Sequence, residues 1–219
     1  MRLVVFDLDG TLIDSHAFIT SVMTETFVSE GLSPPTPEEG RGVIGLSLPV
    51  ALEKLSGVSG AALDALVARY RNIFHARVGD EGQELLFTGA LDALNQLAAE
   101  PETLLGIATG KAMRGVERML DMHDLGEHFV TRQTPDTNPS KPHPGMLISA
   151  MNETGVAPEQ VVMIGDTTFD MEMAKAADCF AIGVSWGSHP ENLLLDSGAD
   201  VVIHSYNDLL PAINSLLEA

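Results

Sequence analysis

The chain has 219 residues, 45% of them hydrophobic, and its 12 basic and 31 acidic residues give a formal net charge of −19. That length allows one domain with a full core, or a domain that carries an insertion. A surface of this charge repels nucleic acid and anionic membranes, so we expect neither as a partner. An anionic substrate would therefore need a local positive site, a metal ion, or both.

The N-terminus and the single cysteine bear on location. The N-terminus leads directly into a strand-like run and lacks the features of a signal peptide, and no apolar run approaches the length of a membrane span. Cys179 has no second cysteine with which to form an intrachain disulfide, which suits a reducing compartment. We therefore expect a cytoplasmic protein.

Short apolar runs along the chain predict strands, and helical patterns separate most of them. We expect five strands and a weaker sixth near residues 128–130. Strands that alternate with helices are typical of a parallel sheet with helices on both faces, a three-layer α/β core of Rossmann-like type. Such sheets bind ligands at the carboxyl ends of their strands. The five predicted strands span residues 3–7, 103–108, 161–165, 180–184 and 200–203.

One long gap interrupts this alternation. No convincing strand lies between Leu8 and Thr103, although a crossover needs only a dozen or so residues. Residues 15–86 instead show apolar stripes at helical spacing, broken by proline and glycine clusters. We expect a helical cap domain at 15–86, inserted into a core of residues 1–14 and 87–219. The stripes comprise Phe18, Val22, Thr26 and Phe27; Val50, Leu52 and Leu55; and Leu63, Leu66, Val67, Tyr70 and Phe74.

The first predicted strand ends in Asp7-Leu8-Asp9-Gly10-Thr11-Leu12. An aspartate at a strand's carboxyl end can serve as a nucleophile, a metal ligand, or both. Alternate residues of a strand share a side, so Asp7 and Asp9 could face one reaction centre. The alternative is that this cluster of Asp and Gly only forms a turn.

Two later segments add a hydroxyl and a cation. Thr109-Gly110 follows the second predicted strand, and a hydroxyl beside a flexible backbone amide can hold a phosphate oxygen. Lys141 lies in Ser140-Lys141-Pro142-His143-Pro144, where two prolines stiffen the backbone. Its ammonium could be fixed near an anion, or it could be a solvated loop lysine.

A further predicted strand ends at Asp166, and Asp170 follows four residues later. If a helix begins at once, both carboxylates lie on the same side of it. The alternative is a helix cap with negative charge in the first turn. Carboxylate oxygens without a nearby cluster of Cys or His favour Mg²⁺ over Zn²⁺.

These four segments, in their order and spacing, resemble the haloacid dehalogenase superfamily of phosphohydrolases. Asp7 to Leu12 resembles its first motif, Thr109 its second, Lys141 its third, and Gly165-Asp166-Thr167-Thr168-Phe169-Asp170 its fourth. A helical cap inserted after the first strand resembles the family's type-one architecture. The segments 183–187 and 197–200 resemble its phosphoglycolate-phosphatase-like branch.

This resemblance implies a magnesium-dependent phosphatase that acts on a small phosphorylated metabolite, with phosphoglycolate as an example. Asp7 would attack phosphorus to form an aspartyl-phosphate. Asp9 would protonate the leaving oxygen and then take a proton from water. Thr109 and Lys141 would hold the phosphoryl oxygens, with backbone amides from Gly110 or Leu8.

The resemblance also implies the ligands of the metal ion. Mg²⁺ would be bound by the Asp7 carboxylate, the Asp9 backbone carbonyl and Asp166. Asp170 would be a further ligand or would contact one. The metal ion and Lys141 would supply the positive field that the net charge of −19 lacks.

Two positions concern substrate choice. Related phosphatases often carry asparagine after the second motif's threonine, where this chain has Gly110, so a polar contact from that position is in doubt. In the cap, Arg41 is the best candidate for substrate binding, since flanking glycines permit a tight turn and Arg can bind carboxylate or phosphate through two hydrogen bonds. His16 could also reach substrate, although a hinge or surface role is favoured for it.

Three other functions are open to this chain. A haloalkanoate dehalogenase shares the fold and the nucleophile, but it does not need Asp9 or the pair Asp166 and Asp170. A sugar-phosphate mutase shares all four motifs and is the main alternative. A non-enzymatic binding protein could lose any motif residue, yet all are present.

The sequence leaves open whether the protein is a monomer or a homodimer. It also predicts two hinges between the cap and the core, near residues 14–15 and 86–89.

Overall fold

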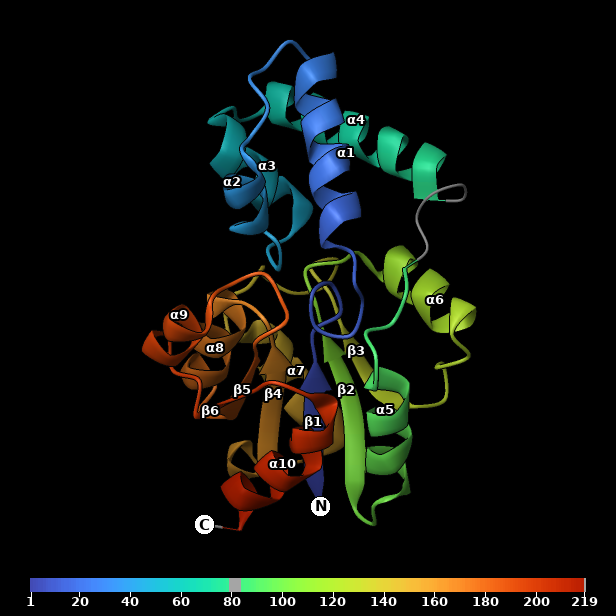
Figure 1. Ribbon diagram of the computed structural model, residues 1–219, viewed down its shortest axis with the longest axis vertical. Coiled ribbons are helices and arrows are strands. Elements are labelled where there is room, and N and C mark those ends of the chain that lie inside the picture. The colour runs from blue at the N-terminus through green and yellow to red at the C-terminus, as the bar shows by residue number, and fades with distance from the viewer. Residues whose placement is uncertain (79–83, 219) are drawn as a thin grey trace.

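Six parallel strands form a single sheet in the computed structural model, which describes residues 1–78 and 84–218 (Figure 1). The strand order is β3-β2-β1-β4-β5-β6, and all neighbours pair in parallel. The predicted α/β class is confirmed, and the weaker predicted strand near residues 128–130 is β3. The strands are β1 (Arg2–Phe6), β2 (Thr103–Ala108), β3 (Phe129–Gln133), β4 (Val161–Gly165), β5 (Phe180–Val184) and β6 (Val201–Ile203).

Helices cover both faces of this sheet. In β1, Val4 and Phe6 join a hydrophobic cluster with α5, α6 and α10, whereas Leu3 and Val5 join a second cluster with α7 and α8. Because alternate residues of a strand point to opposite faces, an uninterrupted apolar strand is what a sheet buried on both sides requires. These core helices are α5 (Ala90–Ala99), α6 (Met113–Met122), α7 (Gly145–Thr154), α8 (Thr168–Ala176), α9 (Glu191–Asp196) and α10 (Leu209–Leu217), with short 3₁₀ turns η1 (Pro158–Gln160) and η2 (Tyr206–Asp208).

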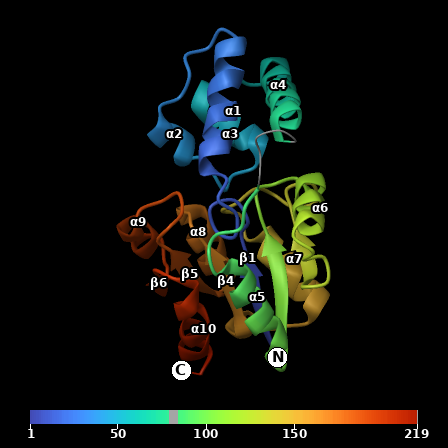
Figure 2. The same cartoon turned by 45° about the vertical axis from the view of Figure 1, so that its right-hand side comes forward.

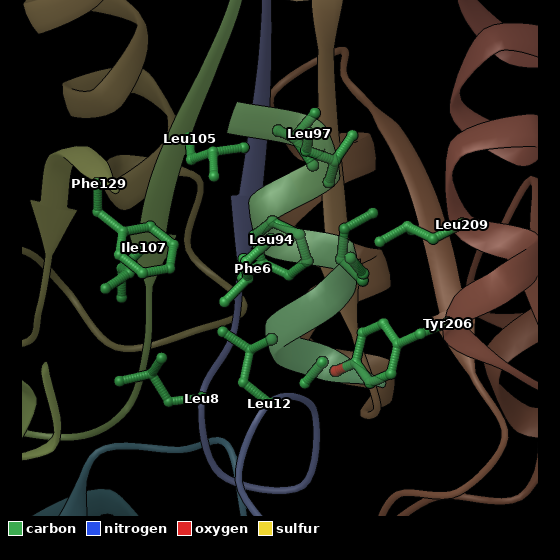
Figure 3. Packing of buried hydrophobic residues seen from close by; sticks show 14 of the residues in the cluster. Phe6, Leu8, Leu12, Leu94, Leu97, Leu105, Ile107, Phe129, Tyr206 and Leu209 are labelled. Atoms are coloured by element: carbon green, nitrogen blue, oxygen red, sulfur yellow. The ribbon is translucent and has the colours of Figure 1, made fainter. Parts of the chain in front are cut away.

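The packing of α5 illustrates how the first face is filled. Leu94 and Leu97 of α5 are buried in the same cluster as Phe6 of β1 (Figure 3). Phe129 of β3 meets the Phe6 ring edge to face, with ring centres 6.5 Å apart. This packing fixes the strands whose carboxyl ends carry the predicted site residues.

Four helices stand beyond the carboxyl ends of the strands, namely α1 (His16–Ser29), α2 (Pro37–Arg41), α3 (Leu48–Ser56) and α4 (Ala61–Val78) (Figures 1 and 2). They share a hydrophobic cluster of their own, which includes Val22, Phe27, Leu52 and Leu66. One position of the predicted stripe is wrong, because Val50 is 40% exposed. Since α3 begins at Leu48, its buried face instead runs through Ala51 and Leu52.

Two connections join these four helices to the sheet, and they run side by side. The Asp14 amide donates to the Leu85 carbonyl and the Phe87 amide to the Leu12 carbonyl, each at 2.9 Å. The two segments predicted to be hinges are therefore hydrogen-bonded to each other. Residues 79–83, part of the predicted helical stretch, lie outside the described residues. Within residues 1–78 and 84–218, no helix has both the length and the apolar character of a membrane span.

Candidate active site

Buried charged side chains meet at the carboxyl edge of the sheet. Asp7 directly follows β1, Asp166 directly follows β4, and Asp170 lies in the first turn of α8. Lys141, in the loop before α7, reaches the same point. All four are at most 1% exposed. Burial of this many charges is costly unless they are paired or bind a metal ion, so their arrangement needs a functional explanation.

Lys141 links two of these carboxylates. Its Nζ lies 2.6 Å from Asp170 Oδ1 and 3.0 Å from Asp7 Oδ2. Burial lowers the pKa of Lys141, but the charges of Asp170 and Asp7 outweigh it and raise that pKa above its ordinary value. Lys141 is thus held as a cation beside Asp7. Of its two sequence interpretations, the solvated loop lysine is excluded.

The pKa of Asp7 is raised by its surroundings. Burial raises its pKa from 3.8 to about 7; Lys141 opposes the rise, and the charges of Asp170 and Asp166 add to it. The Leu8 amide donates to Asp7 Oδ1 at 2.7 Å and so fixes the carboxylate. A single lysine therefore does not offset three clustered carboxylates, and a bound cation would relieve the excess negative charge.

Asp166 is held by three residues from distant segments. Thr11 donates from its hydroxyl to Oδ1 at 2.9 Å, and the Ser188 amide donates to Oδ2 at 2.7 Å. His16 Nε2 lies 3.7 Å from Oδ2 and 2.9 Å from the Ser188 hydroxyl. Although burial raises the pKa of Asp166, the nearby His16 ring and the hydrogen bond from the Ser188 amide bring it below its ordinary value. This carboxylate is kept ionised.

Asp170 fulfils both interpretations of its sequence position. Its Oδ2 accepts hydrogen bonds from the Thr167 amide at 3.1 Å and the Thr167 hydroxyl at 2.7 Å, which completes a capping box at the start of α8. Its Oδ1 remains directed at Lys141. The residue thus caps a helix and at the same time places a carboxylate in the cluster.

Asp7, Asp166 and Asp170 each offer a carboxylate oxygen, and these three oxygens lie within 4.8 Å of one another. An all-oxygen set of this kind is what Mg²⁺ prefers, since it binds through one or two carboxylates and keeps several waters. The excess negative charge at Asp7 is a second observation that favours a cation here. The residues present therefore fit the predicted ion.

Asp9 has different surroundings from Asp7. It accepts a hydrogen bond from the Ser15 hydroxyl at 2.7 Å, and both of its carboxylate oxygens lie 3.0 Å from Lys111 Nζ. Its side chain is not part of the carboxylate group that could hold a metal ion among the described residues. The two aspartates of the first motif are thus separated into different electrostatic environments.

Lys111 and Glu84 were missed by the sequence reasoning. Lys111 Nζ lies 2.9 Å from Glu84 Oε1, and Glu84 Oε2 accepts from Arg118 at 2.9 Å. Lys111 directly follows Thr109-Gly110, so its ammonium was a visible signal that went unused. Glu84 could not have been found, because nothing in its local sequence indicates that it reaches α6.

Helices α1 to α4 and the loops between them are called the helical unit below. Thr109 and Gly110 lie where this unit meets the sheet. Thr109 is buried, and its hydroxyl accepts from the Lys111 amide at 3.3 Å. A Cβ at Gly110 would lie 2.5 Å from the Leu46 carbonyl oxygen and 2.6 Å from that of Gly45. The glycine at this position thus has a steric cause, because the loop of the helical unit leaves no room for a side chain.

A cavity of about 530 Å³ opens between the helical unit and the sheet. Asp7, Asp9, Thr109 and Gly110 line it. Arg41 does not: it is exposed at the end of α2 and is not among the lining residues. The structure therefore brings together every predicted site residue of the core, but it does not bring Arg41 to them.

Comparisons with known proteins agree with this architecture. The sequence profile of the haloacid dehalogenase-like hydrolase family matches residues 4–184. "Probable phosphatase IndB" of Dickeya dadantii is 32% identical, with 99% of this chain and 95% of that protein covered. Phosphoglycolate phosphatase of Salmonella typhi is 30% identical, with coverage of 97% and 92%. A haloacid dehalogenase-like hydrolase from Streptococcus pneumoniae superposes with a TM-score of 0.83 at 27% identity, over 97% of this chain and 98% of that one.

Proposed function

The chain belongs to the haloacid dehalogenase-like hydrolase family and is one of its phosphatases, and we propose that it hydrolyses a small phosphorylated metabolite through an aspartyl-phosphate on Asp7. Phosphoglycolate is one possible substrate. One observation carries the proposal: Asp7, Lys141, Asp166 and Asp170 form one buried cluster, and Asp7 lines the same cavity as Asp9.

Asp7 is the proposed nucleophile. One of its carboxylate oxygens forms a bond to phosphorus while the bond from phosphorus to the ester oxygen breaks. The Leu8 amide and the Lys141 ammonium, at 2.7 and 3.0 Å, hold the carboxylate in a fixed orientation for this attack. Lys141 and Thr109 are also proposed to hold the other phosphoryl oxygens, with the Gly110 amide. Such positioning and charge neutralisation are the main requirements of phosphoryl transfer.

Asp9 is the proposed proton carrier. It would give a proton to the leaving oxygen in the first step. In the second step it would take a proton from water, whose oxygen bonds to phosphorus as the bond between Asp7 and phosphorus breaks. The products are an alcohol and inorganic phosphate, and both aspartates return to their starting state. Asp9 lines the cavity, and its side chain is not one of the three clustered carboxylates, among the described residues, that could hold a metal ion. Both features suit this role.

Mg²⁺ is the proposed cofactor, held by Asp7 and Asp166, by the Asp9 backbone carbonyl, and by Asp170 directly or through a contact with another ligand. When bound it would neutralise charge on the phosphoryl group. Thr11, Ser188 and His16 orient Asp166 for that task by the hydrogen bonds and contacts described above.

Residues 15–86 are the proposed cap, which would exclude bulk water during the reaction. The paired connections support a motion of the whole unit, since the two segments are hydrogen-bonded and would bend together. A cytoplasmic location and an assembly of one or two copies complete the proposal; the single, buried Cys179 suits a reducing compartment.

Release of inorganic phosphate from a panel of metabolite monoesters tests the proposal, with Mg²⁺ and with a chelator. We expect release that depends on Mg²⁺ and is lost in Asp7→Asn. Asp14→Asn is a matched control, because Asp14 is an exposed aspartate in the same segment. The proposal fails if no monoester is hydrolysed, or if Asp7→Asn retains parental activity. Isomerisation of a hexose 1-phosphate without net phosphate release would support the mutase alternative instead.

A further inference from the structure

Basic side chains gather on one part of the cavity, although the chain as a whole is strongly acidic. Four of the 12 lysine and arginine residues line it, and His75 lies among them. The acidic lining residues are Asp7 and Asp9 at the reaction centre, and Asp136. Asp136 accepts the Met113 amide at 2.7 Å and so caps the start of α6. The four basic residues are Arg71, Lys111, Arg114 and Arg118.

These cations come from two elements that face each other. Arg71 and His75 lie on α4, and Arg114 and Arg118 lie on α6; both views show the end of α4 above α6 (Figures 1 and 2). The Arg118 guanidinium lies 5.4 Å from the centre of the Phe74 ring. The pKa of His75 is lowered by desolvation and by the charges of Arg114, Arg118 and Arg71, which line the same cavity. A positive field therefore spans the boundary between the helical unit and the sheet.

Two of these guanidinium groups differ from the other cations in how they are paired within the described part of the chain. Arg118 and Lys111 share Glu84, and Lys111 also pairs with Asp9. Arg71 and Arg114 are exposed and have no ion pair within residues 1–78 and 84–218. They are thus available to a ligand that carries negative charge, which arginine can bind through two parallel hydrogen bonds.

Part of the cavity wall is apolar. Ile19, Met23, Val43 and Ile44 line the cavity and belong to the hydrophobic cluster of α1–α4. The volume of about 530 Å³ is typical of sites for ligands larger than a two-carbon acid. An apolar segment of a ligand would lie favourably against this wall.

From this arrangement we infer that the substrate carries a second anionic group, bound by Arg71 and Arg114, and that an apolar part of the substrate packs against the wall formed by Ile19, Met23, Val43 and Ile44. The inference rests on the proposed function, because the orientation of the ligand follows from an attack by Asp7. Arg71 and Arg114 are then specificity residues, whereas Asp7 and Asp9 act on any monoester.

Two pairs of compounds test the inference. The phosphate monoesters of 4-hydroxybenzoate and 4-hydroxybenzamide differ only in the charge of the distal group. Their non-hydrolysable partners, 4-carboxybenzylphosphonate and 4-carbamoylbenzylphosphonate, report binding without turnover. We expect the parent to favour the carboxylate member of each pair by about 10- to 100-fold, the effect of one or two charge-assisted hydrogen bonds.

The double variant Arg71→Gln/Arg114→Gln should lose this preference, so that its kcat/KM values for the carboxylate and amide esters become equal within about twofold. Arg69→Gln is the matched control, because Arg69 lies on α4, pairs with Glu30 at 2.9 Å and does not line the cavity. Arg69→Gln should behave like the parent.

Three results overturn the inference: equal binding of the two phosphonates by the parent, no binding of either, or a preference that survives in the double variant. A preference among the phosphonates that depends on both arginines, with no phosphate release from any ester, refutes the proposed hydrolysis and leaves the anion site standing. The two proposals can thus fail separately.

Discussion

Lys111 Nζ lies 3.0 Å from both carboxylate oxygens of Asp9, and it contacts Glu84 on its other side. The proposed proton carrier is therefore held by a fixed cation. Because both oxygens of Asp9 are engaged, at least one of these contacts must loosen before Asp9 meets the leaving oxygen. An incoming phosphate ester, which is itself anionic, can attract the ammonium and free that oxygen.

Lys111→Met tests this relationship. Methionine keeps much of the apolar stem but removes the charge, so Asp9 loses its orientation and buried Glu84 loses one partner. We expect kcat/KM to fall about 10- to 100-fold, less than the roughly 10²- to 10⁴-fold cost of removing an acid–base group, because Asp9 remains but is less well oriented. Lys175→Met, which breaks the surface pair with Asp200 at 2.6 Å, is the control and should leave kcat/KM unchanged. Equal effects of the two variants would contradict a specific role for Lys111.

The metal site gives a second prediction. Mg²⁺ should raise the melting temperature of the parent, since a ligand at 100 times its Kd stabilises by about 2.7 kcal/mol. Asp166→Asn should weaken that response, because the substitution removes one of three clustered carboxylates. Asp14→Asn should respond like the parent. Thermal denaturation against Mg²⁺ concentration checks this, and an undiminished response in Asp166→Asn would contradict the assigned ligands.

The raised pKa of Asp7 predicts how metal-free stability changes with pH. Between its unfolded value of 3.8 and the folded value of about 7, the folded protein binds more protons than the unfolded chain. Asp7 therefore contributes stability below about pH 4 that is lost as the pH rises to about 7. We compare the melting temperatures of the parent and Asp7→Asn in the presence of a chelator. The difference, parent minus variant, should fall as the pH rises from about 4 to about 7. Adding Mg²⁺ should reverse the fall, and a difference that stays constant with pH would contradict the assignment.

Core packing gives a prediction with a control on the same helix. Leu94 of α5 is fully buried against the sheet (Figure 3), whereas Leu91 of the same helix is 43% exposed. Leu94→Ala should lower the free energy of unfolding by about 2–5 kcal/mol, from lost burial and the cavity left behind. Leu91→Ala should change it by less than about 1 kcal/mol. Urea denaturation measures both, and similar losses would mean that α5 packs differently.

The sequence was sufficient to predict the sheet and the buried cluster, for a physical reason. Strands buried on both faces must be apolar throughout, and parallel strands bring their carboxyl ends to one edge. Asp7, Thr109 and Asp166 could therefore be placed together from their positions after strands. Asp170 followed from the spacing of one helical turn, and Lys141 from the resemblance in motif order.

Contacts between the helical unit and the sheet could not be predicted in the same way. Arg41 was chosen because glycines flank it, but α2 ends there and leaves the residue exposed and off the cavity. Arg71 and Arg114 are separated by 43 positions in the numbering, and only the tertiary arrangement brings them to one cavity. Accordingly, Arg41→Ala should leave the relative kcat/KM values across a substrate panel unchanged. A changed ranking of the substrates would show instead that Arg41 contributes to substrate binding.

Gly110 gives the last prediction, because it is where the helical unit approaches the reaction centre. Gly110→Asn places a Cβ about 2.5 Å from the Leu46 carbonyl oxygen, too close for either backbone to remain where it is. The loop of residues 45–46 must therefore move away. This opens the cavity and increases the exposure of Asp7 to solvent. We expect a lower kcat and a faster loss of amide protection in that loop by hydrogen exchange. Gly126→Asn is the control, since a Cβ there meets nothing within 4 Å. Parental kcat and protection in Gly110→Asn would show that this approach is not needed for turnover.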